Sequence, residues 1–293
     1  MGIMVRTNLM IIKILSYSLL LSAAVGGLLS SSLLYTNGNL ASVASAVLLP
    51  FNYSFSQAGM LHEAANMNVS SSPYWWVNSG GFIRVGNGTG GTPIGELPAH
   101  TSWRKLYSIS NPVDTDNGYR PQNIFRLVGR SQWQDVMQTM YFKVEKTNLS
   151  ASPNRNASNG ILLFTRYTDG NNLYYAGIRV DGNAVIKKKK SGSYTTLGQK
   201  KIIPGVWNSK NTPNLLPQKT WIGVRTVTKN EGNAVRVTMF TDVGKTGTWT
   251  EVLSVLDDGT RGGAALTAAG YGGVRTDFMD VSFDDYQLSE IPQ

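Results

Sequence analysis

Cysteine is absent from the 293-residue sequence. The chain therefore has no disulfide framework, no cysteine-ligated zinc or iron–sulfur site and no thiol nucleophile. Histidine is nearly absent, since only His62 and His100 occur, and this excludes a histidine-rich metal centre. Stability must come from a packed core, and a chain of this length can bury one.

Several catalytic signatures are also missing. The sequence contains no phosphate-binding Gly-x-x-x-x-Gly-Lys loop, no dinucleotide fingerprint, no His-Glu-x-x-His and no Gly-x-Ser-x-Gly. The glutamates are scattered singly, so the Glu-x-Asp-x-x-Glu strand of retaining β-glucanases does not occur. These absences argue against phosphoryl transfer, dinucleotide redox chemistry, serine hydrolysis and glycoside hydrolysis by carboxylates on one strand.

Acidic residues are missing from the first part of the chain, up to Glu63. Arg6 and Lys13 precede a largely apolar run over residues 14–34, and the small residues Ala44-Ser45-Ala46 follow. A short basic region before an apolar run is typical of a secretory signal or an uncleaved anchor. We therefore expect residues 1–46 to be a signal peptide or membrane anchor. The protein is then extracellular or at the cell surface, and it contacts a membrane only through this segment if it is uncleaved.

The chain is basic, with a net charge of +9, and it keeps +7 without the two positive charges of residues 1–46. For an exported protein, this charge predicts an acidic polysaccharide or cell-surface glycan as the partner. Nucleic acid is not expected, because no recognisable binding module is present. Five Asn-x-Ser/Thr sequons in loop-like contexts predict a glycoprotein. They lie at Asn52, Asn68, Asn87, Asn148 and Asn156.

Short runs of alternating hydrophobicity, separated by glycine- and asparagine-rich turns, follow residue 95 and predict an all-β fold. We expect strands over residues 123–128, 139–144, 160–167, 173–180, 184–190, 194–197, 221–227, 234–241, 248–255 and 279–288. Residues 57–67 are the one fair candidate for a helix after residue 46. We therefore divide the chain into the leader 1–46, an extension 47–94 that packs on the main domain, and an antiparallel β-sandwich over 95–293.

Three stretches carry a resemblance to a known family. They are GILLFTRYTDGNNLYYAGIRVDGNAVIKKKKSGSYTTL, WIGVRTVTKNEGNAVRVTMFTD and GYGGVRTDFMDVSFDDYQL. Together they resemble the central and closing strands of the concanavalin A-like lectin/glucanase (laminin G-like jelly-roll) sandwiches. The resemblance implies an antiparallel jelly roll. It does not decide activity, because such sandwiches include lectins, glycosidases, lyases and adhesion modules.

Four consecutive lysines end one predicted strand, which forms a hairpin with residues 173–180. Alternation places Lys187 and Lys189 on one face of the sheet and Lys188 with Lys190 on the other. One interpretation is a charged strand end that protects a sheet edge from pairing with other chains. The other is a ligand-binding face, in which Lys187 and Lys189 join Tyr175 and Arg179 of the partner strand to bind a sugar carboxylate and stack on a pyranose ring.

A second cluster predicts an alternative function. The segment YRPQNIFRLVGRSQWQDVMQTMYFKV is weakly similar to the YFK strand of jelly-roll polysaccharide lyases, although the companion Gln-x-His is missing. In a lyase, Gln122 or Arg126 on one strand face would neutralise a uronate carboxylate, and Tyr141 and Lys143 would transfer protons during β-elimination. The alternative is a purely structural role, in which these residues form a polar sheet face and the aromatic residues belong to the core.

No cofactor is required by either function, but structural Ca²⁺ is a further hypothesis. Asp284 on the last strand resembles the calcium-binding aspartates of related sandwiches, and the loop with Asp114 and Asp116 is rich in oxygen donors. Ordinary Asx-turns are the alternative there. Trp75 and Trp76 are either a sugar-stacking platform or core residues. The sequence thus predicts a non-catalytic binding or adhesion module for acidic polysaccharide, with a uronate-specific lyase as the alternative.

Overall fold

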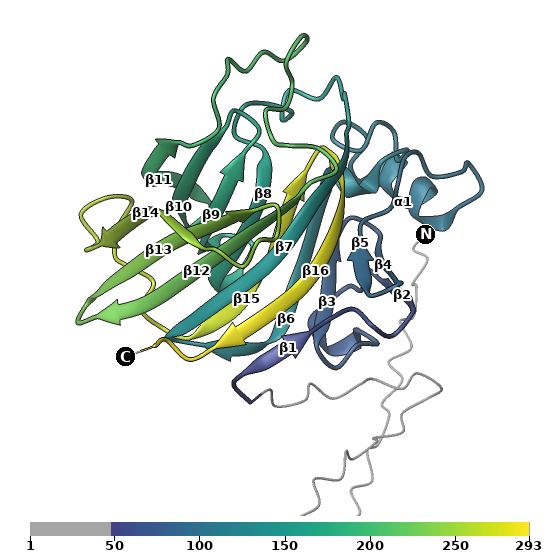
Figure 1. Cartoon of the computed structure of the whole chain (residues 1–293). Helices are drawn as coiled ribbons and strands as arrows, with labels where there is room; N and C mark the ends of the chain where they lie inside the picture. The colour runs from purple at the N-terminus through teal and green to yellow at the C-terminus, as the bar shows by residue number, and fades with distance from the viewer. Residues whose placement is uncertain (1–47, 293) are drawn as a thin grey trace, which may run out of the picture. The chain divides into compact units, whose positions relative to one another are not determined.

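The computed structural model describes residues 48–292, and these form two antiparallel sheets packed face to face. The predicted all-β antiparallel sandwich is therefore confirmed (Figure 1). The leader predicted over residues 1–46 lies outside the described residues. Within residues 48–292, no helix is both long and apolar enough to span a bilayer.

Sheet A contains nine strands, and its hydrogen-bonded neighbours run antiparallel. In order across the sheet these are β14 (Thr250–Asp257), β13 (Ala234–Val243), β12 (Trp221–Glu231), β7 (Val136–Thr147), β16 (Met279–Ser289), β5 (Thr89–Gly91), β4 (Phe82–Gly86) and β2 (Gly59–His62). The short strand β1 (Phe51–Tyr53) also pairs with β16.

Sheet B contains seven antiparallel strands. Its order is β11 (Ser193–Lys201), β10 (Asn183–Lys190), β9 (Asn172–Arg179), β8 (Gly160–Asp169), β15 (Gly270–Asp277), β6 (Ile124–Trp133) and β3 (Trp75–Ser79). The helical elements are α1 (Ser102–Ser110) and the single 3₁₀ turns η1 (Met67–Val69) and η2 (Pro121–Asn123).

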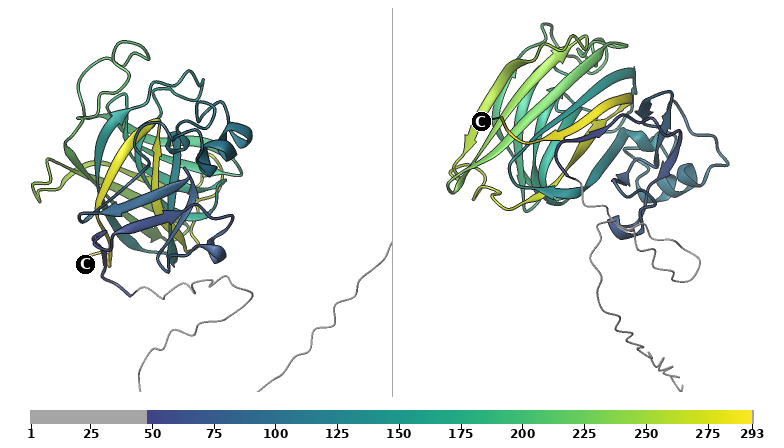
Figure 2. Two further views of the ribbon diagram at one scale, coloured as in Figure 1. Left: turned by 90° about the vertical axis from the view of Figure 1, so that its right-hand side faces the viewer. Right: turned by 60° about the horizontal axis from the view of Figure 1, so that its bottom comes forward.

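The segment before residue 95 is built into both sheets. Strands β1, β2, β4 and β5 belong to sheet A, whereas β3 belongs to sheet B (Figures 1 and 2). The helix expected over residues 57–67 is wrong, because Gly59–His62 pairs with β4 as strand β2. Glycine within this segment weakens a helix and leaves the backbone free to join the sheet edge. The α-helix forms at α1 instead, where Tyr107 is buried.

The main core lies between the two sheets and consists of aliphatic and aromatic side chains from their inner faces. Phe125 of sheet B and Phe283 of sheet A bring their ring centroids to 5.5 Å, and Phe142 packs edge-on against Phe283 at 5.9 Å. Such aromatic pairs add about 0.5–1.5 kcal/mol each beyond the area they bury. The inner faces of the two sheets are therefore largely occupied by core packing.

A second, smaller apolar cluster lies on the other face of sheet B. Alternation along β9 sends Tyr174 into the main core and Leu173 and Tyr175 into this outer cluster, which also contains Leu162 and Val185. The outer face of sheet B is thus partly apolar, and polar side chains lie around this apolar floor.

The lysine run of β10 follows the predicted alternation. Lys188 points into the sandwich, where its side chain is fully buried and its Nζ lies 2.8 Å from Oδ1 of Asp257 on β14. The hydroxyl of Tyr174 donates to the other carboxylate oxygen at 2.5 Å. A buried ion pair is tolerated when both charges are hydrogen-bonded in this way. The pair connects the two sheets and fixes which face of β10 points inward.

Removal of one charge from this pair has a large expected effect on stability. Lys188→Ala leaves Asp257 buried without its cation and should lower the free energy of unfolding by about 3–5 kcal/mol. Lys200→Ala, at an exposed position on β11, is the matched control and should change it by less than about 0.5 kcal/mol. Guanidinium unfolding followed by tryptophan fluorescence measures both. Equal stability of the two variants would contradict the assigned role of Lys188.

Candidate functional site

The outer face of sheet B contains a hollow of about 420 Å³. It is lined by side chains of β8, β9, β10, β11 and β15 and of the loop before β8, and we call it the cationic hollow. The lining residues are Asn156, Ser158, Asn159, Leu162, Tyr175, Lys187, Tyr194, Thr196, Arg275 and Asp277.

Strand register places three lining residues side by side. Lys187 on β10 pairs with Tyr175 on β9 and with Thr196 on β11. The rings of Tyr175 and Tyr194 stack with centroids 6.3 Å apart. Tyr175 is buried, but Tyr194 is 60% exposed and Nζ of Lys189 lies 4.8 Å from its ring centroid. The hollow therefore combines an exposed aromatic ring with the ammonium group of Lys187, and Lys189 contacts that ring from outside the lining.

The ammonium of Lys187 has no hydrogen-bond or ion-pair partner within residues 48–292. Burial, and then the neighbouring Arg179 guanidinium, lower the pKa of Lys187 below that of an ordinary lysine, against weaker attraction from Asp277 and Asp181. A half-buried cation in a positive surrounding is electrostatically unfavourable. A bound anion would relieve this, and none of the described side chains supplies one in contact with Lys187.

Two arginines extend the positive charge along the same face. Arg126 on β6 and Arg275 on β15 are directly opposite in the strand register. Arg275 has a carboxylate partner, since its Nε lies 2.6 Å from Oδ1 of Asp277. Arg126 donates to neutral groups, Asn78 Oδ1 at 3.1 Å and the Tyr175 hydroxyl at 3.3 Å, and also contacts Tyr167. Like charges at opposed positions destabilise a sheet, so these arginines also favour an anion above them.

The four residues predicted to bind a ligand therefore lie on one face of sheet B. Tyr175 and Lys187 line the hollow, and Lys189 contacts its exposed aromatic residue while donating to the Gly170 carbonyl at 2.8 Å. Arg179 lies near Lys187 and forms an ion pair with Asp181 at 2.6 Å. The alternation predicted for the hairpin is confirmed, whereas the ligand-binding role stays a prediction.

The sequence did not identify Arg275 and Asp277 as site residues. They lie on β15, whose sequence GYGGVRTD was not predicted to be a strand. Its glycines are typical of turns. Alternation of Val274 and Thr276 with Arg275 and Asp277 is a signal of a strand with one polar face. Tyr194 lies within a predicted strand, but its exposure was not predictable there.

The four residues proposed for a lyase lie in three separate places. Arg126 is on the outer face of sheet B, whereas Tyr141 and Lys143 are on the outer face of sheet A. The prediction that Gln122 lies on a strand face is wrong. Gln122 is fully buried in η2, where it donates to Asp280 Oδ1 at 2.9 Å. Pro121 begins this 3₁₀ turn, and the strand starts only after the turn, at Ile124. The four side chains therefore do not form one site.

Tyr141 is also poorly suited to accept a proton. Its hydroxyl donates to Asp242 Oδ2 at 2.7 Å. Burial, and then this hydrogen bond to a carboxylate, raise the pKa of Tyr141 well above its usual value. Lys143 lies 3.2 Å from Glu145 and 4.8 Å from the Trp221 ring centroid, so it already has a carboxylate and an aromatic partner.

The aspartates considered for calcium are bonded to protein groups. Asp114 accepts from Ser152 and Asn154, and Asp116 accepts from Ser150 at 2.5 Å. Asp284 lies elsewhere, on β16, and pairs with Lys245. No group of three or more histidine, aspartate or glutamate side chains within residues 48–292 is arranged to hold a metal ion. The calcium hypothesis stays a prediction without a ligand cluster in this part of the chain.

Trp75 and Trp76 both have partners within the fold. Trp75 is 3% exposed and packs in the main core, and Trp76 covers the outer cluster while its Nε1 donates to Ala64 O at 2.8 Å.

The side chain of the sequon residue Asn148 is buried, although the sequence context had predicted a loop accessible to glycosylation. It is 1% exposed and donates to Asn123 Oδ1 and Asp280 Oδ1, so the folded protein cannot be glycosylated there.

Comparisons with known proteins give fold-level similarity alone. No family model and no curated protein sequence matches the chain. Among solved structures, the carbohydrate binding module CBM66 from Bacillus subtilis aligns with 12% identity and a TM-score of 0.40 over 58% of this chain and 83% of its own. The Lotus tetragonolobus seed lectin aligns with 10% identity and a TM-score of 0.42 over 84% and 99%.

A third similar structure is the GH43 BlXynB protein from Bacillus licheniformis, with 9% identity and a TM-score of 0.42. It aligns with 82% of this chain, but with only 39% of its own length. At these scores, the similarities contribute nothing to the assignment of a ligand or activity, which must come from the site itself.

The environment of Lys187 predicts its titration. Reductive methylation with ¹³C-formaldehyde makes each lysine visible by NMR, and the Lys187→Ala variant identifies the signal of Lys187. We expect its midpoint below the ordinary lysine value, because burial and Arg179 disfavour the charged form. Arg179→Ala should move the midpoint up towards the ordinary lysine value of about 10.4. A Lys187 midpoint at or above the ordinary lysine value would contradict the described electrostatics.

Proposed function

We propose that the protein is an exported, non-catalytic module that binds acidic polysaccharide or a cell-surface glycan through the cationic hollow. One observation carries the proposal. The half-buried ammonium of Lys187, which has no hydrogen-bond or ion-pair partner within residues 48–292, lies beside stacked tyrosines in a hollow that also contains Arg275. Cations and an exposed ring are the groups that recognise a uronic acid.

Each part of such a sugar has a suitable partner in the hollow. The carboxylate would accept charge-assisted hydrogen bonds from Lys187 and Arg275. The apolar face of the pyranose ring would stack on Tyr194, the exposed ring. Sugar hydroxyls would bond to the side chains of Asn156 and Asn159 in the loop before β8. The apolar floor formed by Leu162 and Tyr175 keeps water from competing below the sugar.

Export is part of the proposal and is supported by the basic and apolar pattern of residues 1–46. Outside the cell, the net positive charge would steer the protein towards anionic polymers. The lyase alternative has no geometric support, because Arg126 and Tyr141 lie on different faces of the sandwich. It is kept as an outcome of the binding experiment.

The proposal predicts binding to uronate polymers that depends on Lys187. The full chain is tested by biolayer interferometry against alginate, pectate, hyaluronate and glucuronan, with dextran as the neutral control. We expect binding to at least one acidic polymer and none to dextran. Lys187→Ala should raise Kd about tenfold or more, because a hydrogen bond to a charged group is worth about 1.5–3 kcal/mol. Added salt should weaken binding.

Lys229→Ala is the matched control, since it removes the same charge at an exposed position on β12, away from the hollow. Equal loss of affinity in both variants would show that overall charge alone attracts the polymer. Absorbance of unsaturated sugar is followed in the same samples. A steady rise that disappears in Tyr141→Phe would establish a lyase and overturn the non-catalytic function.

A further inference from the structure

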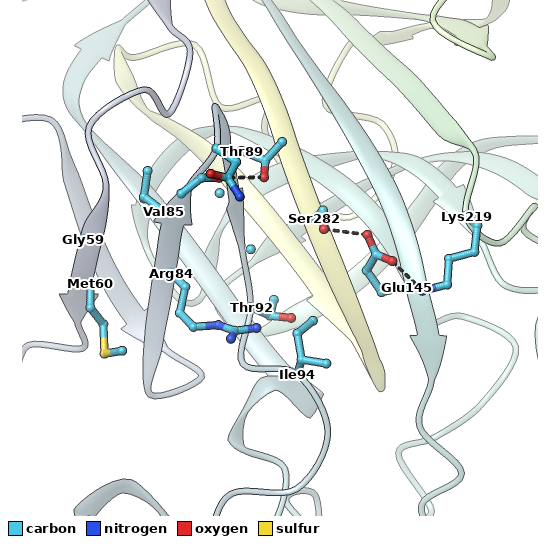
Figure 3. Close-up of a pocket in the computed structure, with 14 residues that line it drawn as sticks. Gly59, Met60, Arg84, Val85, Thr89, Thr92, Ile94, Glu145, Lys219 and Ser282 are labelled. Atoms are coloured by element: carbon cyan, nitrogen blue, oxygen red, sulfur yellow. Dashed lines mark hydrogen bonds and ion pairs between the residues drawn. The ribbon is translucent and has the colours of Figure 1, made fainter.

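The outer face of sheet A contains a second and larger hollow of about 760 Å³. Strands β2, β4, β5, β7 and β16 and the residue Lys219 contribute to it. Figure 3 shows Arg84 on one side, Glu145 with Lys219 on the other, and Ser282 between them. We call it the sheet A hollow. It lies on the opposite face of the sandwich from the cationic hollow.

Strand register explains why a trough forms there. One row of neighbouring residues crosses the sheet from Met60 through Arg84, Gly91 and Ser282 to Lys143. The two middle positions have no side chain or a very small one, whereas the outer positions have long ones. Since neighbouring strands lie about 4.8 Å apart, the backbones of Arg84 and Lys143 are about 14 Å apart. This width accommodates an extended polymer chain between two cationic walls.

The charges of the two walls do not balance. Glu145 is the one carboxylate among the lining residues, and it receives Lys219 at 2.6 Å and Lys143 at 3.2 Å. Arg84, on the other wall, is exposed and has no hydrogen-bond or ion-pair partner within residues 48–292. Two lining cations, Arg84 and Lys219, therefore face one lining carboxylate, which Lys143 also contacts from outside the lining. An anionic ligand fits this surplus better than a neutral one.

Apolar side chains complete the trough. Met60 is 50% exposed and Ile94 is 48% exposed, and both line the hollow. A sugar chain presents apolar ring faces as well as charged groups, and it would cover this surface. The same chemical class of ligand, an acidic glycan, therefore fits both hollows.

We propose that the sheet A hollow is a second site for an acidic glycan chain, so that one molecule bridges two polymer chains. This inference rests on the proposed function of the cationic hollow. The two hollows face away from each other across sheets that pack about 10 Å apart, so a chain extended along one face does not reach the other. Bridging rather than tighter binding of one chain is the expected result.

A capture experiment with the full chain tests the bridging. Alginate, pectate, hyaluronate and glucuronan are each immobilised, the protein is bound, and the same polymer in fluorescent form is then added. We expect the wild type to capture labelled polymer. Arg84→Ala/Lys219→Ala should bind the immobilised polymer with a Kd within twofold of wild type. The amount of labelled polymer that this variant captures should be at least tenfold lower than for wild type. Lys210→Ala/Lys229→Ala removes two charges at exposed positions elsewhere and should capture normally.

The outcomes separate the two proposals. A wild type that binds the surface but captures nothing overturns the second site and leaves the proposed function intact. Undiminished capture by Arg84→Ala/Lys219→Ala also overturns it, as does capture of labelled dextran, which would indicate a neutral-sugar site. Absence of surface binding refutes the proposed function itself. Sedimentation velocity on the same protein preparation in solution must show a monomer. If the protein were a dimer, capture could come from one site on each subunit, and this would overturn bridging within one molecule.

Discussion

The buried ion pair of Lys188 and Asp257 determines how sheet B presents its charges. A strand shifted by one residue exchanges its two faces. Because Lys188 needs a carboxylate inside the sandwich, β10 has one acceptable register, and Lys187 and Lys189 must point outward. Tyr174 contributes a hydrogen bond to the same carboxylate and thereby fixes β9 relative to β10. The position of the candidate site is thus a consequence of an interaction inside the core.

Both candidate sites are built on strands rather than on long loops. Inward-facing residues form the core. The residues that alternate with them along each strand form the polar outer faces. Arg126, Arg275 and Leu162 belong to one row of strand positions, so their relative placement is set by backbone hydrogen bonds. Groups held in this way lose little freedom on binding, which favours recognition of a repeating polymer.

Much of sheet B was predictable from the sequence, because its hairpins have explicit turns and regular alternation. The separation of Lys187 from Lys188 follows from a period of two residues and needed no tertiary information. Tertiary contacts decided the remaining features. Gln122 lies after Arg120-Pro121 in a turn, where its buried amide nitrogen donates to Gly95 O and Asp280 Oδ1. Arg275 became part of the site only because β15 inserts between β6 and β8, which are far from it in sequence.

The buried amide of Asn148 matters for the cell in which the chain is made. In an exported chain, oligosaccharyl transfer would act on the nascent polypeptide, before Asn148 forms its hydrogen bonds to Asn123 and Asp280. A glycan attached at that moment would occupy the space that the closing strand needs. Under the export proposed above, glycosylation at Asn148 and completion of the sandwich would therefore exclude each other.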